Sequence, residues 1–326
     1  MTMRAAVVTR LDGPAAIEIR QVDEPGDDGL VVVDVHAAGV AFPDALLTRG
    51  RYQYRPDPPF VPGAEVAGVV RAAPDVAAVR PGDRVVGLTM LAGGMAEVAA
   101  LRPDRVFPLP DTIGFAAGAG LLFNDLTVHF ALRLRGRLAA GETVLVHGAA
   151  GGIGTAALRL APVLGAARTI AVVSSQEKAA VATAAGATDV VLVDGFKDAV
   201  KELTDGRGVD LVVDPVGGDR FTDSLRSLAP AGRLLVIGFT GGEIPTVKVN
   251  RLLLNNIDVV GVGWGAWAGS HPGALGEQWD ELHQLLAGGR LAAPEPVVYP
   301  LDEAATAIAA LENRTATGKV VLRVRD

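Results

Sequence analysis

The stretch that decides the fold is Ala149-Ala150-Gly151-Gly152-Ile153-Gly154. It follows the apolar, β-rich residues 143–147 and opens a helical pattern that runs to about residue 164. A strand, a glycine turn and a helix N-terminus together form a phosphate site for a dinucleotide. Glycine lets the backbone approach the pyrophosphate, and the free N–H groups of the helix attract its charge. The fingerprint reads A-x-G-x-x-G, and alone it also fits a plain tight turn or another cofactor such as S-adenosylmethionine.

The segment after the second predicted strand indicates which dinucleotide binds. This strand covers residues 169–173, and Ser174, Ser175, Gln176, Glu177 and Lys178 follow it. An NAD(H) site usually carries an Asp or Glu here, bonded to the ribose hydroxyls. Two hydroxyls and a lysine suit a 2′-phosphate instead, so the sequence favours NADP(H) as the cofactor. The same residues also fit a simple helix start, with Ser175 as the cap and Glu177 in the first turn.

Composition excludes several classes of function. The length of 326 residues suggests about two domains. The net charge is −7 and there is no basic run, so we expect no nucleic-acid partner. The chain has no cysteine, which excludes disulfides, thiolate zinc sites and iron–sulfur clusters. No stretch resembles a signal peptide or an apolar span of about twenty residues, so we expect a cytoplasmic protein without a membrane partner.

The chain divides into three segments by pattern. Residues 1–123 contain short strands broken by Gly, Pro and Asp turns, which predicts a β-rich domain. Residues 124–265 alternate strand and helix patterns, which predicts a doubly wound parallel sheet. Residues 266–326 contain two helical patterns and a final strand. The strands predicted within the alternating segment lie at residues 143–147, 169–173, 189–193, 210–214, 233–237 and 258–262.

With this order in hand, the chain resembles the zinc-free quinone oxidoreductases of the medium-chain dehydrogenase/reductase superfamily, related to zeta-crystallin. The resemblance covers essentially the full length. It rests on the order and spacing of seven motifs, which occupy residues 39–44, 62–68, 81–85, 93–97, 149–154, 214–218 and 317–321. It implies an α/β fold with a GroES-like domain at 1–123, an NADP(H)-binding Rossmann domain at 124–265 and a return segment at 266–326. It also implies an active site between the domains and a homodimer joined through the Rossmann sheets.

The resemblance also indicates the branch of the superfamily. Zinc alcohol dehydrogenases carry a cysteine and a histidine at the positions of Ala41 and Ala64. Alanine offers no lone pair to a metal, so we expect no metal site and no alcohol oxidation. The chemistry left is hydride transfer to an acceptor that is already electrophilic, such as a quinone or an activated double bond.

The resemblance assigns roles to individual residues. Tyr52 and Asp44 are expected at the reacting end, with Tyr52 as the best proton donor; an interfacial aromatic and a plain helix cap are the alternatives. Thr127 is expected near the nicotinamide, or else only starts a helix. Trp264 and Trp267 could wall a flat acceptor or simply pack. The predicted cofactor contacts are Phe42, Thr127, Gly151, Gly152, Ile153, Gly154, Ser174, Ser175, Lys178, Val216, Gly238, Phe239, Thr240, Gly263, Trp264, Gly265 and Lys319.

Three positions depart from the family pattern. Relatives often carry Asn at Ala41 and Tyr at Leu46, and a tyrosine that helps to hold the 2′-phosphate is Gly195 here. The cleft should therefore suit a small apolar conjugated acceptor. The leading interpretation is an NADPH-dependent, zinc-independent reductase of quinones or similar conjugated carbonyls. The alternatives are an enoyl-thioester or alkenal reductase, and an NADPH-binding sensor or structural protein with little turnover.

Overall fold

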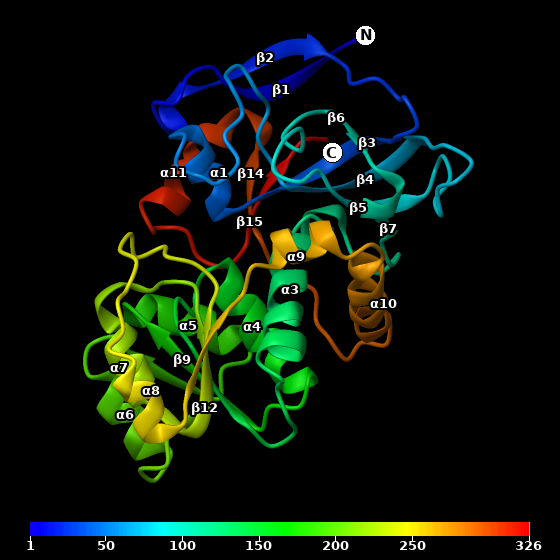
Figure 1. Ribbon diagram of the computed structural model, residues 1–326. Coiled ribbons are helices and arrows are strands. Elements are labelled where there is room, and N and C mark those ends of the chain that lie inside the picture. The colour runs from blue at the N-terminus through cyan, green and yellow to red at the C-terminus, as the bar shows by residue number, and fades with distance from the viewer. Residues whose placement is uncertain (326) are drawn as a thin grey trace. The chain divides into compact units, whose positions relative to one another are not determined.

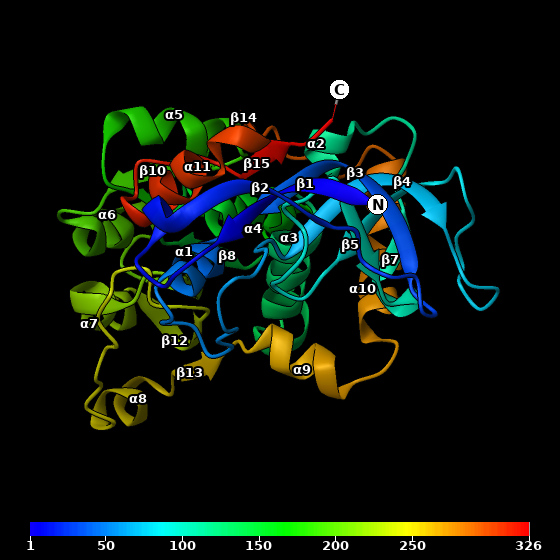
Figure 2. The same cartoon turned by 90° about the horizontal axis from the view of Figure 1, so that it is seen from above.

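The computed structural model describes residues 1–325, which form two compact units (Figures 1 and 2). Unit 1 comprises residues 1–123 and the return segment from Pro272 onward. Unit 2 comprises Asn124–His271. Helix α3 (Leu122–His129) begins at the end of the first part of unit 1 and continues into unit 2.

Unit 1 consists mainly of antiparallel strands. Its elements are β1 (Thr2–Val8), η1 (Pro14–Ala16), β2 (Ile17–Asp23), β3 (Val31–Val40), α1 (Phe42–Thr48), β4 (Glu65–Ala72), β5 (Arg84–Leu88), β6 (Val98–Leu101), η2 (Pro103–Arg105), β7 (Val106–Pro108), α2 (Phe115–Gly118), α10 (Ala274–Ala287), β14 (Val297–Pro300), η5 (Leu301–Glu303), α11 (Ala304–Glu312) and β15 (Val320–Arg323). β1 and β2 form a hairpin. The larger sheet has the order β14-β15-β3-β4-β5-β7, and β6 also pairs with β3.

The C-terminal strand completes this sheet. β15 pairs antiparallel with β3, so that Val320 lies opposite Val40 (Figure 2). The alternation of valines along β3 and β4 turns one face of the sheet into the core, where Val33, Val35 and Val66 are buried. Each fully buried valine contributes about 1.5–3 kcal/mol relative to exposure.

Unit 2 alternates strands and helices. Its elements after α3 are the π-helical turn η3 (Phe130–Arg135), β8 (Thr143–Val146), α4 (Gly152–Val163), β9 (Arg168–Val173), α5 (Gln176–Ala184), β10 (Asp189–Leu192), α6 (Phe196–Leu203), β11 (Val209–Asp214), η4 (Gly218–Arg220), α7 (Phe221–Arg226), β12 (Leu228–Val236), α8 (Asn250–Asn255), β13 (Asp258–Gly261) and α9 (Trp264–Ser270). Helices flank the strands of this sheet in Figure 1.

The sheet of unit 2 is entirely parallel. Its order is β10-β9-β8-β11-β12-β13, with β8 and β11 at the point where the chain reverses its direction of winding. The central strands are largely apolar because helices cover the sheet, and Leu145, Ile170, Val212 and Leu234 are fully buried. The predicted fold class, a β-rich domain together with a doubly wound parallel sheet, is confirmed.

The return to unit 1 begins at Pro272, six residues later than the sequence analysis placed it. The difference is helix α9, which belongs to unit 2. The ring of Trp267 lies 4.7 Å from the ring of Phe130 and 4.9 Å from that of His271, so aromatic packing holds α9 to this unit.

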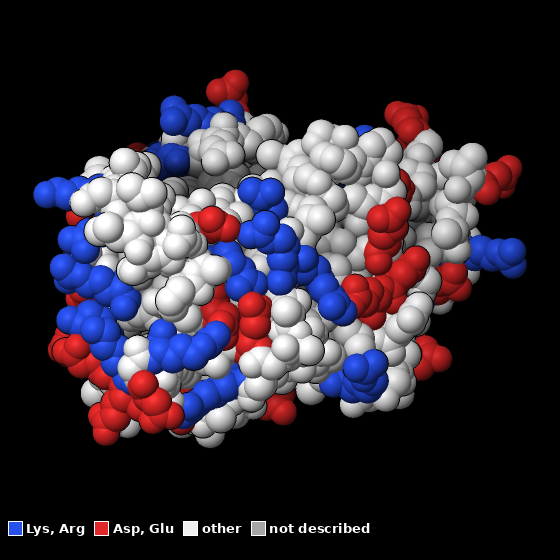
Figure 3. All heavy atoms as spheres, turned by 60° about the horizontal axis from the view of Figure 1, so that its bottom comes forward, with Lys and Arg blue, Asp and Glu red and all other residues white. Residues whose placement is uncertain are grey.

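Two surface properties bear on possible partners. Within residues 1–325, every helix is too short or too polar to cross a bilayer. On the face shown in Figure 3, Lys and Arg side chains lie beside Asp and Glu side chains, in keeping with the mixed composition of the chain.

Candidate functional site

The glycine turn lies between β8 and α4. Gly148 takes a positive φ of 57°, which glycine adopts without strain, and reverses the chain after β8. The Gly151 N–H donates to Gly148 O at 2.9 Å, and the Thr155 N–H donates to Gly151 O at 2.8 Å as the helix begins. The sequence pattern of strand, turn and helix is therefore realised, and α4 ends one residue after Pro162.

The glycines of the turn serve different purposes. A Cβ on Gly154 would lie 2.5 Å from Ala149 Cα and would overlap Gly148 O, so this glycine lets the helix pack on the turn. A Cβ on Gly151 would meet only Gly148 O, at 3.3 Å. Gly151 thus presents an open backbone side, which is the feature that a phosphate needs.

The N-terminus of α4 fits an anion. No side chain caps its first turn, and that turn carries no acidic residue. Helix α5, by contrast, is capped by Ser175, whose Oγ accepts the Lys178 N–H at 3.4 Å. Uncapped N–H groups at the end of a helix dipole attract negative charge, so α4 can hold a pyrophosphate.

Asn124 is a site residue that sequence reasoning missed. A Cβ on Gly152 would collide with its amide nitrogen, so the Asn124 side chain packs directly on the first turn of α4. Nearby, Arg159 Nη2 donates to Asp125 Oδ1 at 2.6 Å and ties α4 to α3. Only tertiary contact identifies Asn124, because it is far from the fingerprint in sequence.

The other predicted contacts of unit 2 gather at one edge of its sheet. In a doubly wound sheet, ligands bind outside the carboxyl ends of the strands near the reversal of strand order, here β8 and β11. Residues that follow the carboxyl ends of the parallel strands, in chain order, are Gly151, Gly152, Ile153, Gly154, Ser174, Ser175, Lys178, Val216, Gly238, Phe239, Thr240, Gly263, Trp264 and Gly265. Their roles as cofactor contacts stay predictions.

The residue directly after β9 is a serine, so no carboxylate stands there to repel a 2′-phosphate. Ser174 is exposed, and Ser175 and Lys178 are partly exposed. Glu177 is exposed in the first turn of α5. Ser175 acts as the helix cap, and its place at the start of α5 is also where a 2′-phosphate would dock.

His147, which follows β8 directly, has a structural environment. It is fully buried, and its Nε2 lies 2.8 Å from Ser224 Oγ. Burial, reinforced by the charge of Arg220, lowers the pKa of His147 to about 3, so the imidazole is neutral.

Asp44 in unit 1 anchors two loops. Its carboxylate is buried and accepts the N–H groups of Ala41, at 2.8 Å, and Gly63, at 3.0 Å. Burial raises the pKa of Asp44 to about 6, although these two N–H groups and the charge of Lys319 oppose the rise. The structure therefore gives Asp44 the capping role that was the alternative for it, and its catalytic role stays a prediction.

Tyr52 is partly buried near Asp44. Burial raises the pKa of the phenol, and the negative charge of Asp44 adds to the effect. A phenol is already protonated at neutral pH at its ordinary pKa of about 10, and the rise keeps it so, which leaves Tyr52 able to act as a hydrogen-bond donor. Phe42, at the start of α1, is partly exposed and precedes Asp44 by two residues.

Lys319 has an internal partner that the sequence did not indicate. Its Nζ donates to Glu65 Oε1 at 2.6 Å and to Val40 O at 3.1 Å, and both charged side chains are buried. Glu65 Oε2 accepts the Phe123 N–H at 2.8 Å, at the start of α3. The pair holds together strands β3, β4 and β15, and a cofactor contact by Lys319 stays a prediction.

Several other predicted site residues are more buried than expected. Thr127 is buried within α3, and Trp264 is buried at the start of α9. Trp267 stacks on aromatic neighbours of its own unit. For both tryptophans, the structure therefore supports the alternative that the side chain simply packs.

The two zinc-ligand positions hold buried alanines, Ala41 and Ala64. Throughout residues 1–325, no group of three or more His, Cys, Asp or Glu side chains is arranged to hold a metal ion. Independence from metal stays a prediction that rests on the residue types.

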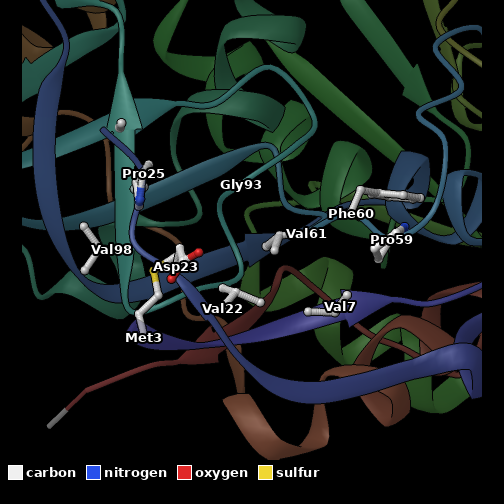
Figure 4. A pocket seen from close by; sticks show the side chains of 12 residues that line it. Met3, Val7, Val22, Asp23, Pro25, Pro59, Phe60, Val61, Gly93 and Val98 are labelled. Carbon is white, nitrogen blue, oxygen red and sulfur yellow. The ribbon is translucent and has the colours of Figure 1, made fainter. Parts of the chain in front are cut away.

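Unit 1 also contains a pocket of about 370 Å³ (Figure 4). Apolar side chains such as Met3, Val22, Phe60 and Val98 line it, and Asp23 is the one charged side chain in its wall. None of the predicted site residues lines this pocket, so it is separate from the chemistry described above.

Comparison with known proteins agrees with this architecture. The family model "Alcohol dehydrogenase GroES-like domain" matches residues 27–111, and "Zinc-binding dehydrogenase" matches residues 152–287. The chain is 38% identical to quinone oxidoreductase-like protein 2 of Rattus norvegicus, over 99% of this chain and 92% of the relative.

Two solved structures are similar over nearly their whole length. A probable oxidoreductase from Mycobacterium abscessus has a TM-score of 0.91 at 43% identity, covering 99% of each chain. The quinone oxidoreductase from Thermus thermophilus, which was also solved in complex with NADPH, has a TM-score of 0.85 at 36% identity, covering 99% of this chain and all of the other.

Proposed function

The chain belongs to the medium-chain dehydrogenase/reductase family, in its quinone oxidoreductase branch, and from this premise we propose that it is an NADPH-dependent reductase of quinones or similar conjugated carbonyl compounds. As a member of this family it is an oxidoreductase. The observation that carries the cofactor assignment is the N-terminus of α4. It is uncapped, free of acidic residues and open at Gly151, beside the reversal of strand order in a parallel sheet.

The choice of NADPH over NADH rests on the residues after β9. Ser174 and Ser175 offer hydroxyl donors, and Lys178 offers a positive charge, where NAD(H) sites carry a carboxylate. The Thermus thermophilus relative was solved with NADPH, which supports the same choice.

NADPH, when bound, supplies the hydride. The protein's own residues bind and orient it. Gly152 and Ile153 offer backbone N–H groups to the pyrophosphate, since the Gly151 N–H already donates to Gly148 O, while Ser174 and Lys178 hold the 2′-phosphate. A conjugated acceptor that receives hydride at carbon develops negative charge on a distant oxygen, and this charge needs a donor. Tyr52, whose phenol is protonated at neutral pH and whose pKa burial raises further, can donate to that oxygen.

Simple alcohols should not be substrates. Their oxidation needs a Lewis acid to stabilise the alkoxide, and Ala41 and Ala64 stand where zinc ligands would be required. The apolar residues Ala41 and Leu46 also favour an apolar acceptor over a charged one.

We also propose that two copies associate through the edge of the unit 2 sheet. β13 pairs only with β12 in the sheet order and so leaves an open edge. Val259 on this strand and Leu253 and Leu254 on the adjacent α8 are exposed apolar side chains, which a second copy would cover. Analytical sedimentation of the wild type and of Val259→Lys measures the oligomeric state. We expect the wild type to be a dimer and the new charge to disrupt it. A monomeric wild type would contradict the proposal.

One assay tests the proposed activity. A 1,4-quinone, an enone, an enoyl thioester and a primary alcohol are offered to the protein with NADPH or NADH, or with the oxidised forms for the alcohol. Consumption of NADPH with the quinone or the enone is expected. Preference for the enoyl thioester would move the substrate class to double-bond reduction, and alcohol oxidation faster than either reduction would refute the mechanism. Tight NADPH binding with no turnover would indicate a sensor or structural protein.

A further inference from the structure

Two loops at the carboxyl edge of the unit 2 sheet are joined into one assembly. The β11 loop covers residues 215–218, and the β12 loop covers residues 237–245. The Thr240 N–H donates to Pro215 O at 3.1 Å, and the Gly241 N–H donates to Val216 O at 2.8 Å. Together with a bond from the Gly218 N–H to Glu243 O at 3.2 Å, these bonds run along both loops. The two loops are therefore bonded to each other at three points.

Asp214 lies at the base of both loops. Its side-chain Oδ1 accepts the N–H groups of Val216 and Gly217, each at 2.9 Å. Its backbone carbonyl accepts the Ile237 N–H, also at 2.9 Å, where the β12 loop begins. The side chain is 1% exposed, so water does not compete for these bonds. A single residue thus fixes the start of the β11 loop by its carboxylate and the start of the β12 loop by its carbonyl.

The conformation of the loops depends on glycine at two close approaches. Gly217 has φ 63° and ψ −143°, a region that only glycine enters readily, and a Cβ there would lie 2.9 Å from the Phe239 ring. A Cβ on Gly241 would lie 2.7 Å from Val216 O. The turn at Gly217 needs outside support because its backbone is unusual, and the two N–H bonds to Asp214 provide it.

These loops carry Val216, Gly238, Phe239 and Thr240, which are predicted cofactor contacts. We infer that Asp214 is a positioning residue for NADPH: it does not touch the cofactor, but it fixes the paired β11 and β12 loops in the conformation that binds it. This inference rests on the proposed function of the site. Without the carboxylate the β11 loop would lose both of these bonds, and cofactor binding would have to order it and the β12 loop bonded to it.

Two substitutions of Asp214 separate the effect of its acceptor oxygen from the effect of its negative charge. Asp214→Ala removes the acceptor for both N–H groups, whereas Asp214→Asn keeps one carbonyl oxygen able to accept both. We expect Asp214→Ala to raise the Kd for NADPH about tenfold or more and to accelerate amide hydrogen exchange at residues 215–218 and 237–243 in the cofactor-free protein. Asp214→Asn should stay within about threefold of the wild type in Kd, with near-normal exchange.

Asp210 provides a matched control on the same strand. It lies four residues earlier, about 13 Å away along β11, and its Oδ2 accepts the Thr143 N–H at 2.8 Å. Asp210→Ala should lower the melting temperature but leave the NADPH affinity and the exchange of both loops unchanged. If Asp214→Ala is too unstable to measure, Gly217→Ala takes its place, because it perturbs the β11 loop without altering Asp214. This variant should also weaken NADPH binding.

The outcomes are distinguishable. Unchanged loop exchange in Asp214→Ala, or unchanged NADPH affinity despite faster exchange, overturns the positioning role while the proposed function stands. An Asp214→Asn variant as weak as Asp214→Ala means that the charge acts on the cofactor directly and also overturns it. Failure of the wild type to bind NADPH refutes the proposed cofactor and, with it, the inference, because nothing would then be positioned.

Discussion

Replacing Gly151 by alanine should abolish tight binding of NADPH and leave the protein folded. The backbone at Gly151 has φ −94° and ψ 179°, which any residue adopts, and an added Cβ would lie 3.3 Å from its nearest neighbour, Gly148 O. The free energy of unfolding should therefore change by about 1 kcal/mol or less, the cost of alanine at a helix N-cap.

The loss of cofactor affinity should be larger. The new methyl group would occupy the open side of the turn, which the pyrophosphate must approach. One or two hydrogen bonds from the N–H groups of α4 to the phosphate would be lost, and each such bond to a charged group contributes about 1.5–3 kcal/mol. The Kd for NADPH should rise about 100-fold, which corresponds to roughly 2.7 kcal/mol.

Gly154→Ala is the matched variant, and its main effect should be on the stability of the fold. Its Cβ would lie 2.5 Å from Ala149 Cα, and a backbone neighbour cannot rotate away, so the turn must shift. We expect it to lower the free energy of unfolding by about 3 kcal/mol. Urea unfolding and fluorescence titration with NADPH measure both quantities. Wild-type affinity in Gly151→Ala would mean that the turn is not the phosphate site, and full stability of Gly154→Ala would refute the packing argument.

Four further predictions concern specificity, chemistry, metal and pH. Lys178→Ala should weaken NADPH binding about tenfold to 100-fold and leave NADH binding unchanged. Lys201 is exposed on α6, and Lys201→Ala should change the affinity for neither cofactor. Equal losses for both cofactors in Lys178→Ala would contradict the assignment. Tyr52→Phe should slow reduction of a quinone about tenfold or less at unchanged NADPH affinity, because water can replace the phenol, and undiminished turnover would exclude Tyr52 as the donor. A chelator should leave activity unchanged, and elemental analysis should find no stoichiometric zinc; activity lost to the chelator and restored by zinc would reverse that conclusion. Burial raises the pKa of Asp44 to about 6, so the folded protein binds this proton more tightly than the unfolded chain does. The resulting stabilisation is complete below about pH 4 and is lost as the pH rises through about 6. The free energy of unfolding of the wild type relative to Asp44→Asn should therefore fall by ~2 kcal/mol between about pH 4.5 and about pH 7.5, and a pH-independent difference would show that Asp44 does not titrate there.

The parts of the site that sequence analysis could predict are those encoded within a few residues. The glycine turn, the strand before it and the helix after it are neighbours along the chain, and the period of apolar residues distinguishes strand from helix. The strands of unit 2 could be located for the same reason, since each contains a short apolar run between segments of turn or helix pattern. The absence of ligands at Ala41 and Ala64 is likewise a property of residue identity alone.

What only the tertiary structure decided are the contacts between residues far apart in sequence. Nothing near Lys319 in the sequence indicates its ion-pair partner, which is Glu65, 254 positions away. Asn124 has no local pattern, and its role beside Gly152 arises where two helices meet. Asp214 looks like an ordinary end to a strand, but folding places its carboxylate and carbonyl at the base of two loops that bond to each other. Local pattern determines which elements form because propensity and periodicity act over a few residues, whereas the partner of a buried charge is fixed only when the folded chain has excluded water from around it.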